Sequence, residues 1–565
     1  MSVYALFRQT AERFPERPFL VVLQETAAIY GVEPGEITYG AASAEVERLR
    51  GLYEAAGYGI GHRVGLLLEN RPAFVLHFLA LNGVGASIVP VNPDLRAAEL
   101  EYLAGHSELA LAVAVPPRHD DLRAAFRAAG RDAAVIGPDD APPPPAAPRT
   151  GTAADEGTEA AILYTSGTTG LPKGCILPNG YFLQCARWYP ELGGANTLHE
   201  TIPDGPHAGE GERMINPLPL FHMNALACSL MGMIAVGGAL CVPDRFHPRS
   251  WWASVREARA TCLHYLGVMP PMLMNLPPSP EDRDHAVRWG FGAGVPPALH
   301  APFEERFGFP LAETWAMTET GTGGVINAHV EPRLVGTATF GRATFDGPVG
   351  RHREVEVRIA DENGGNAAVG QPGELLVRRA GPDPRAGFFA GYLKDAEATA
   401  KAWEGGWLHT GDVVSRDADG NLFFLDRRKN VIRRSGENIA AVEVESVVRE
   451  HPAVLDVGVA PVPDPVRGDE VFAAVVSDEA PSEELARAIV FHTLERLAYH
   501  KAPGHVLFVP ELPVTSTNKV KRQDLKELAL AAMDGGTAFD TTGMKKRGAP
   551  DASARAASKR GAVSA

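Results

Sequence analysis

The sequence predicts an α/β protein with a large N-terminal domain of layered α/β subdomains and a small α+β C-terminal domain. Two segments, Val75–Asn92 and Ala225–Val242, each combine an apolar helix pattern, a glycine turn and a β-branched strand. Helices that alternate with strands in this way are typical of mostly parallel sheets covered by helices. From about residue 350, short alternating strands with Gly, Asn and Asp turns instead indicate antiparallel sheet.

Length, charge and cysteine content narrow the class of protein. A chain of 565 residues is too long for one hydrophobic core, so at least two domains are expected. The net charge of -15 repels a phosphate backbone and argues against nucleic-acid binding. Five cysteines without a CxxC pair indicate a reduced, cytoplasmic protein without a disulfide framework or a cysteine metal site. The N-terminal residues form an amphipathic helix pattern and contain no apolar signal core.

The segment Ala225–Val242 has the length of a membrane span but not its composition. Its eighteen residues carry no charge, which is the threshold for a spanning helix. However, it is rich in Ala and Gly, and Gly237-Gly238 interrupts it. A buried helix, a tight turn and a core strand are therefore predicted, and no membrane span.

Other segments predict the domain organisation. "APPPPAAP" (141–148) is typical of a stiff, exposed linker between subdomains. An amphipathic helix is predicted over 436–452, strands over 456–464 and 470–478, and a second helix over 483–498. These patterns favour a large domain over 1–426, a small domain over 427–530 and a disordered tail over 531–565.

The glycine-rich segment "YTSGTTGLPKG" (Tyr164–Gly174) follows the short strand predicted over Ala161–Tyr164. Small residues let backbone N–H groups approach a ligand, the hydroxyls add donors, and Lys173 adds a positive charge, so the loop suits a polyphosphate. It is not a Walker A loop, because Pro172 stands where that motif has glycine and Gly174 follows the lysine. A plain connector is disfavoured, because a proline and a lysine stand between the glycines directly after an apolar strand.

Five further motifs follow in order: "PLPLFHMNAL" (217–226), "ETWAMTETG" (313–321), "WLHTGD" (407–412), "LDRRKNVIRRSGENI" (425–439) and "PVTSTNKVKR" (513–522). With the loop, they resemble the adenylate-forming superfamily over residues 1 to about 530. Within the acyl-CoA synthetase branch of this superfamily, the sequence is most similar to the crotonobetaine/carnitine-CoA ligase group. Trp315 and Ala316 stand where the family has Tyr-Gly.

The resemblance implies an AMP-forming acid–thiol ligase. A carboxylic acid and ATP would give acyl-AMP and pyrophosphate, and transfer to CoA would give an acyl-CoA thioester and AMP. The implied partners are a small carboxylate, ATP, Mg²⁺ and CoA, and a homodimer stays open. Two alternatives remain: transfer to another acceptor, such as a carrier protein or an amine, and a non-catalytic nucleotide-binding homologue. Intact Lys519 and Glu319 argue against the second alternative.

The resemblance also assigns roles to single residues. The small domain would be mobile about the hinge Lys429, and CoA would meet Ser435 and Gly436. Catalytic roles fall to Lys519, Glu319 and Thr318, and Mg²⁺ would bind Glu319 and Thr165, since a hard cation prefers oxygen ligands. ATP would contact Thr165, Ser166, Gly167, Thr168, Thr169, Lys173, Glu313, Thr314, Trp315, Ala316, Asp412 and Arg427. The acyl pocket would contain His222, Asn224, Gly292, Ala293 and Gly294, the glycines leaving open volume, without the aspartate of amino-acid-activating relatives.

Overall fold

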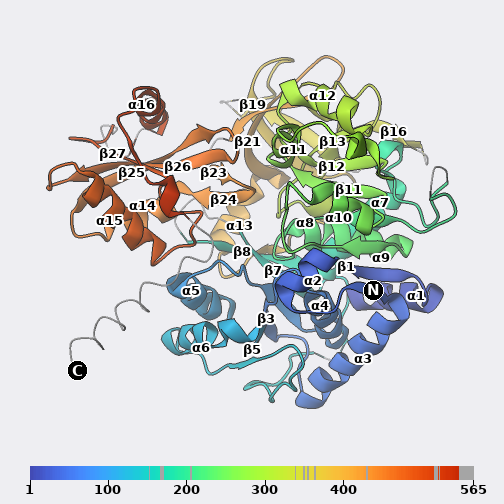
Figure 1. Cartoon of the computed structure of the whole chain (residues 1–565). Coiled ribbons are helices and arrows are strands. Elements are labelled where there is room, and N and C mark those ends of the chain that lie inside the picture. The colour runs from blue at the N-terminus through green and yellow to red at the C-terminus, as the bar shows by residue number, and fades with distance from the viewer. Residues whose placement is uncertain are drawn as a thin grey trace. The chain divides into compact units, whose positions relative to one another are not determined.

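The computed structural model divides into two compact units (Figure 1). It describes residues 1–151, 153–165, 171–203, 207–337, 339–347, 350–352, 355–361, 364–427, 431–513, 520 and 522–545. The first unit comprises Met1–Pro93, Ala104–Tyr164 and Gly174–Arg428. The second comprises the described residues after Lys429, together with Asp94–Leu103 and the described ends of Thr165–Lys173.

An eight-stranded sheet in the first unit carries most of the predicted ligand-binding segments. Its order is β14-β13-β12-β11-β9-β10-β1-β2, and all neighbours from β13 to β1 are parallel. The strands are β1 Pro18–Val22, β2 Gly35–Thr38, β9 Arg213–Ile215, β10 Ala239–Cys241, β11 Cys262–Leu266, β12 Trp289–Ala293, β13 Leu311–Trp315 and β14 Ile326–Asn327. The apolar segment predicted not to span a membrane forms α9 (Cys228–Val236), a left-handed turn at Gly237 and the core strand β10, as predicted.

A seven-stranded sheet of order β20-β8-β7-β4-β3-β5-β6 forms the second layer. The strands are β3 Arg63–Leu67, β4 Ser87–Pro90, β5 Leu111–Ala114, β6 Ala134–Ile136, β7 Glu159–Thr165, β8 Lys173–Pro178 and β20 Gly391–Tyr392. The proline-rich segment 141–148 connects β6 to β7, two strands of this one sheet, so its assignment as a linker between subdomains is wrong. The chain must pass three intervening strands there, and an extended proline-rich segment can do so along the surface.

The helices before residue 428 include two that are buried on nearly every side, α4 and α9. Helices that are apolar all round belong in a core, which explains why neither has a polar face. All five cysteines are buried thiols outside any disulfide. The helices are α1 Val3–Arg13, α2 Gln24–Tyr30, α3 Tyr39–Ala56, α4 Pro72–Val84, α5 Ala97–Ser107, α6 His119–Ala128, α7 Asn179–Glu191, α8 Met223–Leu226, α9, α10 Trp251–Glu257, α11 Met269–Met274, α12 Pro297–Phe307 and α13 Ala396–Ala402.

The alternating segments after residue 350 form the predicted antiparallel sheet, which belongs to the first unit. Its order is β15-β22-β21-β19-β18, and every neighbouring pair is antiparallel. The strands are β15 Thr339–Gly341, β18 Val355–Ala360, β19 Gly373–Arg379, β21 Leu408–Arg416 and β22 Leu422–Arg427, and a separate hairpin pairs β16 Phe345–Gly347 with β17 Gly350–His352.

The second unit is an α+β structure around the hairpin of β25 (Val454–Asp464) and β26 (Gly468–Ser477), drawn in orange in Figure 1. The helix predicted over 436–452 is wrong at its start, because Glu437–Ala440 forms β24 and α14 covers only Ala441–Arg449. A two-residue turn pairs β24 with β23, and this pairing takes the first residues of the pattern into the sheet. The remaining elements are β23 Val431–Arg434, β27 His505–Phe508, β28 Phe539–Asp540, α15 Glu483–Leu494 and α16 Arg522–Asp534.

The predicted disordered tail begins too early at residue 531. Helix α16 continues to Asp534, β28 pairs with β27, and the Phe539 ring lies 5.9 Å from that of Phe508. The ammonium of Lys545 is buried against the carboxylate of Glu470, which also accepts a hydrogen bond from Arg434 Nε at 2.7 Å. A buried ion pair and one aromatic contact therefore order the chain as far as Lys545, and residues 546–565 lie outside the described part.

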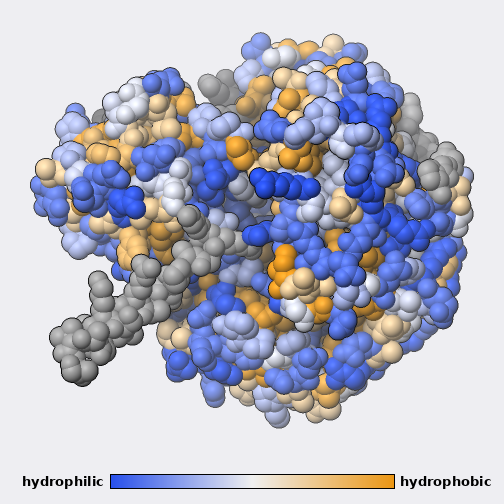
Figure 2. All heavy atoms as spheres, in the orientation of Figure 1, coloured by the Kyte–Doolittle hydropathy of each residue, from blue (hydrophilic) through white to orange (hydrophobic). Residues whose placement is uncertain are grey.

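The hydropathy of one face and the lengths of the described helices bear on the predicted absence of a membrane span. On the face shown in Figure 2, hydrophilic residues dominate and apolar residues form small, scattered groups. Within the described ranges, no helix combines the length and the apolar character that crossing a bilayer requires.

Candidate active site

The predicted acyl and nucleotide segments meet at one edge of the eight-stranded sheet. Strands β9, β11, β12 and β13 are parallel, so their carboxyl ends lie at the same edge, where ligands bind in open α/β sheets. The segment with His222 and Asn224 follows β9, Gly294 follows β12, and the segment 316–321 follows β13. The fold thereby gathers residues that are far apart in the sequence.

A tight turn after β13 presents Thr318 and Glu319. The hydroxyl of Thr320 donates to the carbonyl of Met317 at 2.9 Å and accepts from its N–H at 3.1 Å. The Tyr181 hydroxyl donates to the carbonyl of Thr318 at 2.9 Å. Gly321 has φ +50°, and a Cβ there would lie 2.5 Å from the Tyr181 ring, so the turn requires glycine at this position.

Glu319 lies largely buried in this turn, with 7% of its surface exposed. Its carboxylate accepts a hydrogen bond from the Tyr392 hydroxyl at 2.8 Å, and its carbonyl accepts one from Phe389 N–H at 3.0 Å. Burial, followed by the charge of Glu319, raises the pKa of Tyr392, so the phenol stays a donor. Tyr392 belongs to β20, which pairs with β8, and it therefore ties Glu319 to the seven-stranded sheet.

Trp315 and Asp412 meet inside the first unit from two different sheets. The indole Nε1 of Trp315, at the end of β13, donates to Asp412 Oδ2 on β21 at 2.8 Å. Trp315 is 6% exposed and Asp412 is 2% exposed. Arg427 stands opposite Asp412 in the pairing of β21 with β22, and its side chain lies outside the described part.

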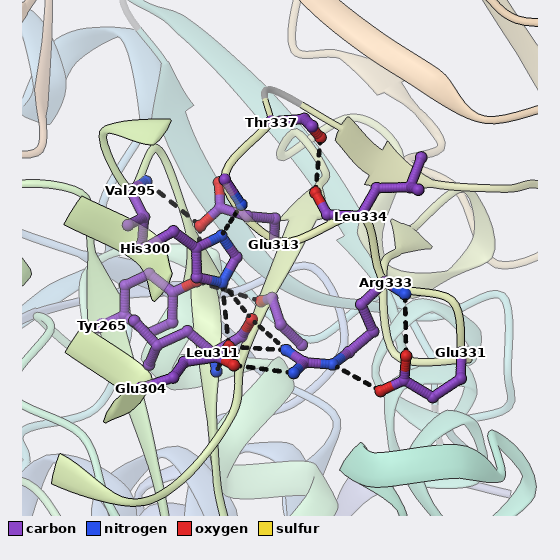
Figure 3. A network of polar contacts seen from close by, with 12 residues as sticks. Tyr265, Val295, His300, Glu304, Leu311, Glu313, Glu331, Arg333, Leu334 and Thr337 are labelled. Atoms are coloured by element: carbon purple, nitrogen blue, oxygen red, sulfur yellow. Dashed lines mark hydrogen bonds and ion pairs between the residues drawn. The ribbon is translucent and has the colours of Figure 1, made fainter. Parts of the chain in front are cut away.

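The side chain of Glu313 supports the turn that follows β12 (Figure 3). Its carboxylate accepts hydrogen bonds from Tyr265 Oη at 2.6 Å, Gly294 N–H at 2.7 Å and Val295 N–H at 3.2 Å. Burial raises the pKa of Glu313, although the three donors oppose that rise. Because these donors occupy the carboxylate, Glu313 would approach a nucleotide only through its backbone. Thr314 would likewise approach a nucleotide only through its backbone, because its hydroxyl donates to the Ile326 carbonyl at 3.0 Å.

A second carboxylate in Figure 3 fixes helix α12 to β13. Glu304 accepts both terminal nitrogens of Arg333 at 2.7 and 2.8 Å and the N–H of Leu311 at 2.8 Å. His300 Nε2 lies 3.1 Å from Glu304 Oε1. Burial alone would raise the pKa of Glu304, but the hydrogen bonds from Arg333, His300 and Leu311 outweigh it and lower the pKa to about 2.

The glycines expected to leave open volume in the acyl pocket serve the packing of strands and a turn. A Cβ on Gly292 would lie 2.2 Å from the carbonyl oxygen of Tyr265 on the neighbouring strand, so β11 and β12 pack closely there. Gly294 has φ +87°, a conformation that a side chain would strain. Tyr265 therefore fills the space that a side chain at position 292 would occupy, and the place of Gly292 in the acyl pocket stays a prediction.

An uncharged polar cluster lies beneath the acyl segment. His264 Nδ1 lies 2.7 Å from Asn224 Oδ1, and His264 Nε2 lies 2.7 Å from the Tyr189 hydroxyl. Asn216 Nδ2 donates to Ser229 Oγ at 2.7 Å and to Asn224 Oδ1 at 2.9 Å. Burial lowers the pKa of His264 to about 3, so the ring is neutral, with one nitrogen donating and the other accepting. Asn224 is the only partly exposed member of the five.

The remaining predicted residues are distributed over both units. Thr165 ends β7, Lys173 begins β8, Ala316 directly follows β13, and His222 precedes α8. Ser435 (φ +51°) and Gly436 (φ +88°) form the exposed two-residue turn between β23 and β24. Six predicted residues lie outside the described part: Ser166, Gly167, Thr168, Thr169, Lys429 and Lys519.

The residues available for Mg²⁺ fit a cation that keeps most of its water. No group of three or more His, Cys, Asp or Glu side chains that could hold a metal occurs in the described ranges. Glu319 offers one buried carboxylate, and Thr165 carries a hydroxyl. Mg²⁺ is commonly held by one or two carboxylates together with waters and substrate phosphates, so this donor set is chemically suitable.

The sequence motifs missed the residues that hold the site in place. Tyr392 lies 73 positions from Glu319, and Tyr181 lies 137 positions from Thr318. Tyr265 and His264 stand on β11, in a segment without a recognisable motif. No local pattern could reveal them, because their partners approach only after the sheets have formed.

Comparisons with known proteins agree with this geometry. The family model "AMP-binding enzyme" matches residues 7–393, and the model "AMP-binding enzyme C-terminal domain" matches residues 443–519. The first match covers more than half of the chain, which therefore belongs to the AMP-binding enzyme family. The resemblance to adenylate-forming acyl-CoA synthetases and the expected fold class are confirmed.

Individual proteins within this family are similar to the chain over most of its length. The chain is 32% identical over 535 residues to a sulfoacetate–CoA ligase of Cupriavidus necator, covering 93% of this chain and 97% of that protein. It is 29% identical over 509 residues to a crotonobetaine/carnitine–CoA ligase of Salmonella paratyphi A, covering 87% and 93%. An amide bond synthetase from Marinactinospora thermotolerans has a similar structure, with a TM-score of 0.74 and 25% identity; the match covers 94% of this chain and 99% of the other.

Proposed function

We propose that this protein is an AMP-forming acid–CoA ligase located in the cytoplasm. A substrate carboxylate oxygen attacks the α-phosphorus of ATP, and the bond to pyrophosphate breaks. The thiol sulfur of CoA then attacks the acyl carbon, and AMP leaves. The observation that carries the proposal is the contact of Trp315 with Asp412, directly before the turn that holds Thr318 and Glu319, in a chain of the AMP-binding enzyme family.

The residues of the motifs bind and orient the nucleotide in this proposal. Asp412 accepts the two ribose hydroxyls, and Thr318 contacts the α-phosphate. Glu319, held by Tyr392, and Thr165 hold Mg²⁺, which when bound offsets the charge of the phosphates. Positioning and electrostatic stabilisation suffice, because neither step needs a covalent intermediate with the enzyme.

The remaining roles, including those of residues outside the described part, come from the motifs. Lys519 neutralises the approaching carboxylate and the α-phosphate, and the loop with Lys173 holds the leaving pyrophosphate. The small domain rotates about Lys429 between the two half-reactions, and Ser435 and Gly436 border the path of the CoA thiol. A homodimer is also proposed, and its mass in solution would test it.

The acyl substrate is proposed to be a short acid whose far end accepts hydrogen bonds. The cluster beneath the acyl segment contains amide, hydroxyl and neutral imidazole groups but no carboxylate. A quaternary ammonium is recognised by accessible aromatic rings or by negative charge. The Tyr189 ring of this cluster is fully buried, so the cluster suits a betaine less well than an oxygen-rich group such as a sulfonate. The similarity to a sulfoacetate–CoA ligase supports the same class.

Release of pyrophosphate tests the proposal directly. Purified protein, ATP and Mg²⁺ are incubated with sulfoacetate, propionate or crotonobetaine, with and without CoA, and the products are identified by mass spectrometry. We expect release with sulfoacetate, and an acyl-CoA thioester only when CoA is present. Absence of pyrophosphate release with a broad panel of acids would indicate a non-catalytic homologue.

The alternative acceptor is an amine, which the similarity to an amide bond synthetase favours. Parallel reactions that contain an amine in place of CoA separate the two proposals. An amide formed faster than the thioester, at equal acceptor concentrations, would replace the CoA-ligase assignment and leave the adenylation step intact.

A further inference from the structure

Trp315 replaces the tyrosine of the family motif and makes a contact that the motif does not predict. Its indole N–H donates to the carboxylate of Asp412 at 2.8 Å. We propose that Trp315 is a positioning residue for ribose recognition, because it fixes the orientation of the Asp412 carboxylate. This inference rests on the proposed binding of the ribose hydroxyls by Asp412.

The backbone around Asp412 is already fixed by its strand. Asp412 N–H donates to Thr410 Oγ1 at 3.1 Å, and Thr410 Oγ1 donates to the Leu375 carbonyl at 2.7 Å. Gly411 has φ +71°, and its N–H donates to Glu374 Oε1 at 3.2 Å. The indole N–H of Trp315 acts on the side chain instead, because it holds the carboxylate through Oδ2.

The chemistry of the two groups suits this role. An indole N–H is a donor only, whereas a carboxylate offers about four acceptor positions over its two oxygens. One bond from Trp315 occupies only one of these positions, on Oδ2. Because Trp315 and Asp412 are 6% and 2% exposed, water competes little for this bond. Hydrogen bonds to a charged acceptor are stronger than neutral ones, so a single indole can hold the group.

The decisive experiment compares ATP with 2′-deoxy-ATP and 3′-deoxy-ATP in the adenylation half-reaction. In Trp315→Phe we expect the KM for ATP to rise about 10-fold, as for loss of one charged hydrogen bond, with a smaller change in kcat. The KM values for the deoxy nucleotides should change less, so the preference for ATP should shrink. A purely structural role would raise all three KM values by the same factor, and that result would overturn the inference.

Trp289→Phe is the matched control. Trp289 lies on the neighbouring strand β12, is 1% exposed, and its Nε1 has no hydrogen-bond acceptor among the described residues. This substitution removes the same atoms from the same sheet but no contact with Asp412. We expect it to lower the melting temperature without changing the preference for ATP. An equal loss of preference in both variants would also overturn the inference.

Two further variants separate the inference from the function on which it rests. Asp412→Ala should abolish the preference for ATP over the deoxy nucleotides; if it does not, the role of Asp412 is wrong and Trp315 cannot act through it. If Trp315→Phe fails to fold, β-(3-benzothienyl)alanine incorporated at position 315 keeps the bicyclic shape and lacks only the N–H. An unchanged nucleotide preference in that protein would contradict the inference.

Discussion

At the scale of single residues, buried carboxylates of the first unit hold the loops of the candidate site. Glu313 receives three donors from β11 and the turn after β12, and Glu319 receives the hydroxyl of Tyr392. A buried carboxylate is tolerated only where donors satisfy it. These side chains therefore connect the strand that carries the nucleotide residues to its neighbours.

Replacing Glu313 with glutamine tests this role. The amide keeps one acceptor oxygen but turns an NH₂ group toward donors, so at least one buried N–H or O–H loses its partner. We expect a loss of about 1–3 kcal/mol in the free energy of unfolding. The KM for the carboxylate substrate should rise as well, because Gly294 and Val295 lose their support. Thermal denaturation and steady-state kinetics measure both effects.

Glu331→Gln provides the comparison for Glu313→Gln. Glu331 belongs to the same network in Figure 3, but its side chain is 78% exposed, and among the described residues its hydrogen bonds go to Arg333. We expect little change in stability or KM. If the two variants behave alike, the support attributed to Glu313 is absent.

At the scale of elements, helix α12 is joined to β13 through Glu304 and Arg333. The pKa of Glu304 is lowered from 4.5 to about 2 in the folded protein. A depressed carboxyl pKa contributes stability at pH values above the unfolded value, and this contribution disappears as the pH falls through the folded value. The affected window therefore extends from about pH 4.5 down to about pH 2.

The comparison of Glu304→Gln with the unmodified protein should depend on pH. Near neutral pH we expect the variant to be less stable by about 3 kcal/mol, the amount that corresponds to this pKa difference. The difference in melting temperature should shrink as the pH falls below about 4.5, because Glu304 then becomes protonated in the unfolded chain. A difference that stays constant between pH 7 and pH 3.5 would mean that packing, and not charge, is responsible.

At the scale of the whole molecule, the chain folds as two units, and the longest segment of the second unit begins directly after Arg428. The proposed hinge, Lys429, stands at this boundary in the sequence. Proline fixes φ, so Lys429→Pro should restrict rotation of the small domain. We expect adenylation to persist and CoA transfer to fall strongly, measured by pyrophosphate release and by thioester formation from supplied acyl-AMP.

Lys519→Ala gives the opposite pattern and serves as the reciprocal control. Adenylation should fall by several orders of magnitude, because the charge on the carboxylate and the α-phosphate is no longer neutralised. Thioester formation from supplied acyl-AMP should survive. If both variants lose both half-reactions equally, neither the hinge nor the catalytic role stands.

The sequence by itself determined the layers, the family and the order of the motifs. Hydrophobic patterning and turn residues are local signals, and they placed α4 with β4 and α9 with β10 correctly. The predictions from local patterns were wrong at Glu437–Ala440, where pairing in a sheet replaces the start of the helix, and near Lys545, where a buried ion pair orders the predicted tail. The assignment of the proline-rich segment 141–148 as a linker between subdomains was wrong for a related reason, because only the strand order shows that this segment connects two strands of one sheet.

Only the tertiary structure decided which side chains act together. Trp315 was expected to meet a nucleotide, but its contact with Asp412 spans 97 positions and joins two sheets. Gly292 was expected to open a pocket, and the neighbouring strand fills the space that a side chain there would occupy. Hydrogen bonds and close packing depend on distances of a few ångströms between remote segments, and these distances are set by how the sheets form and pack.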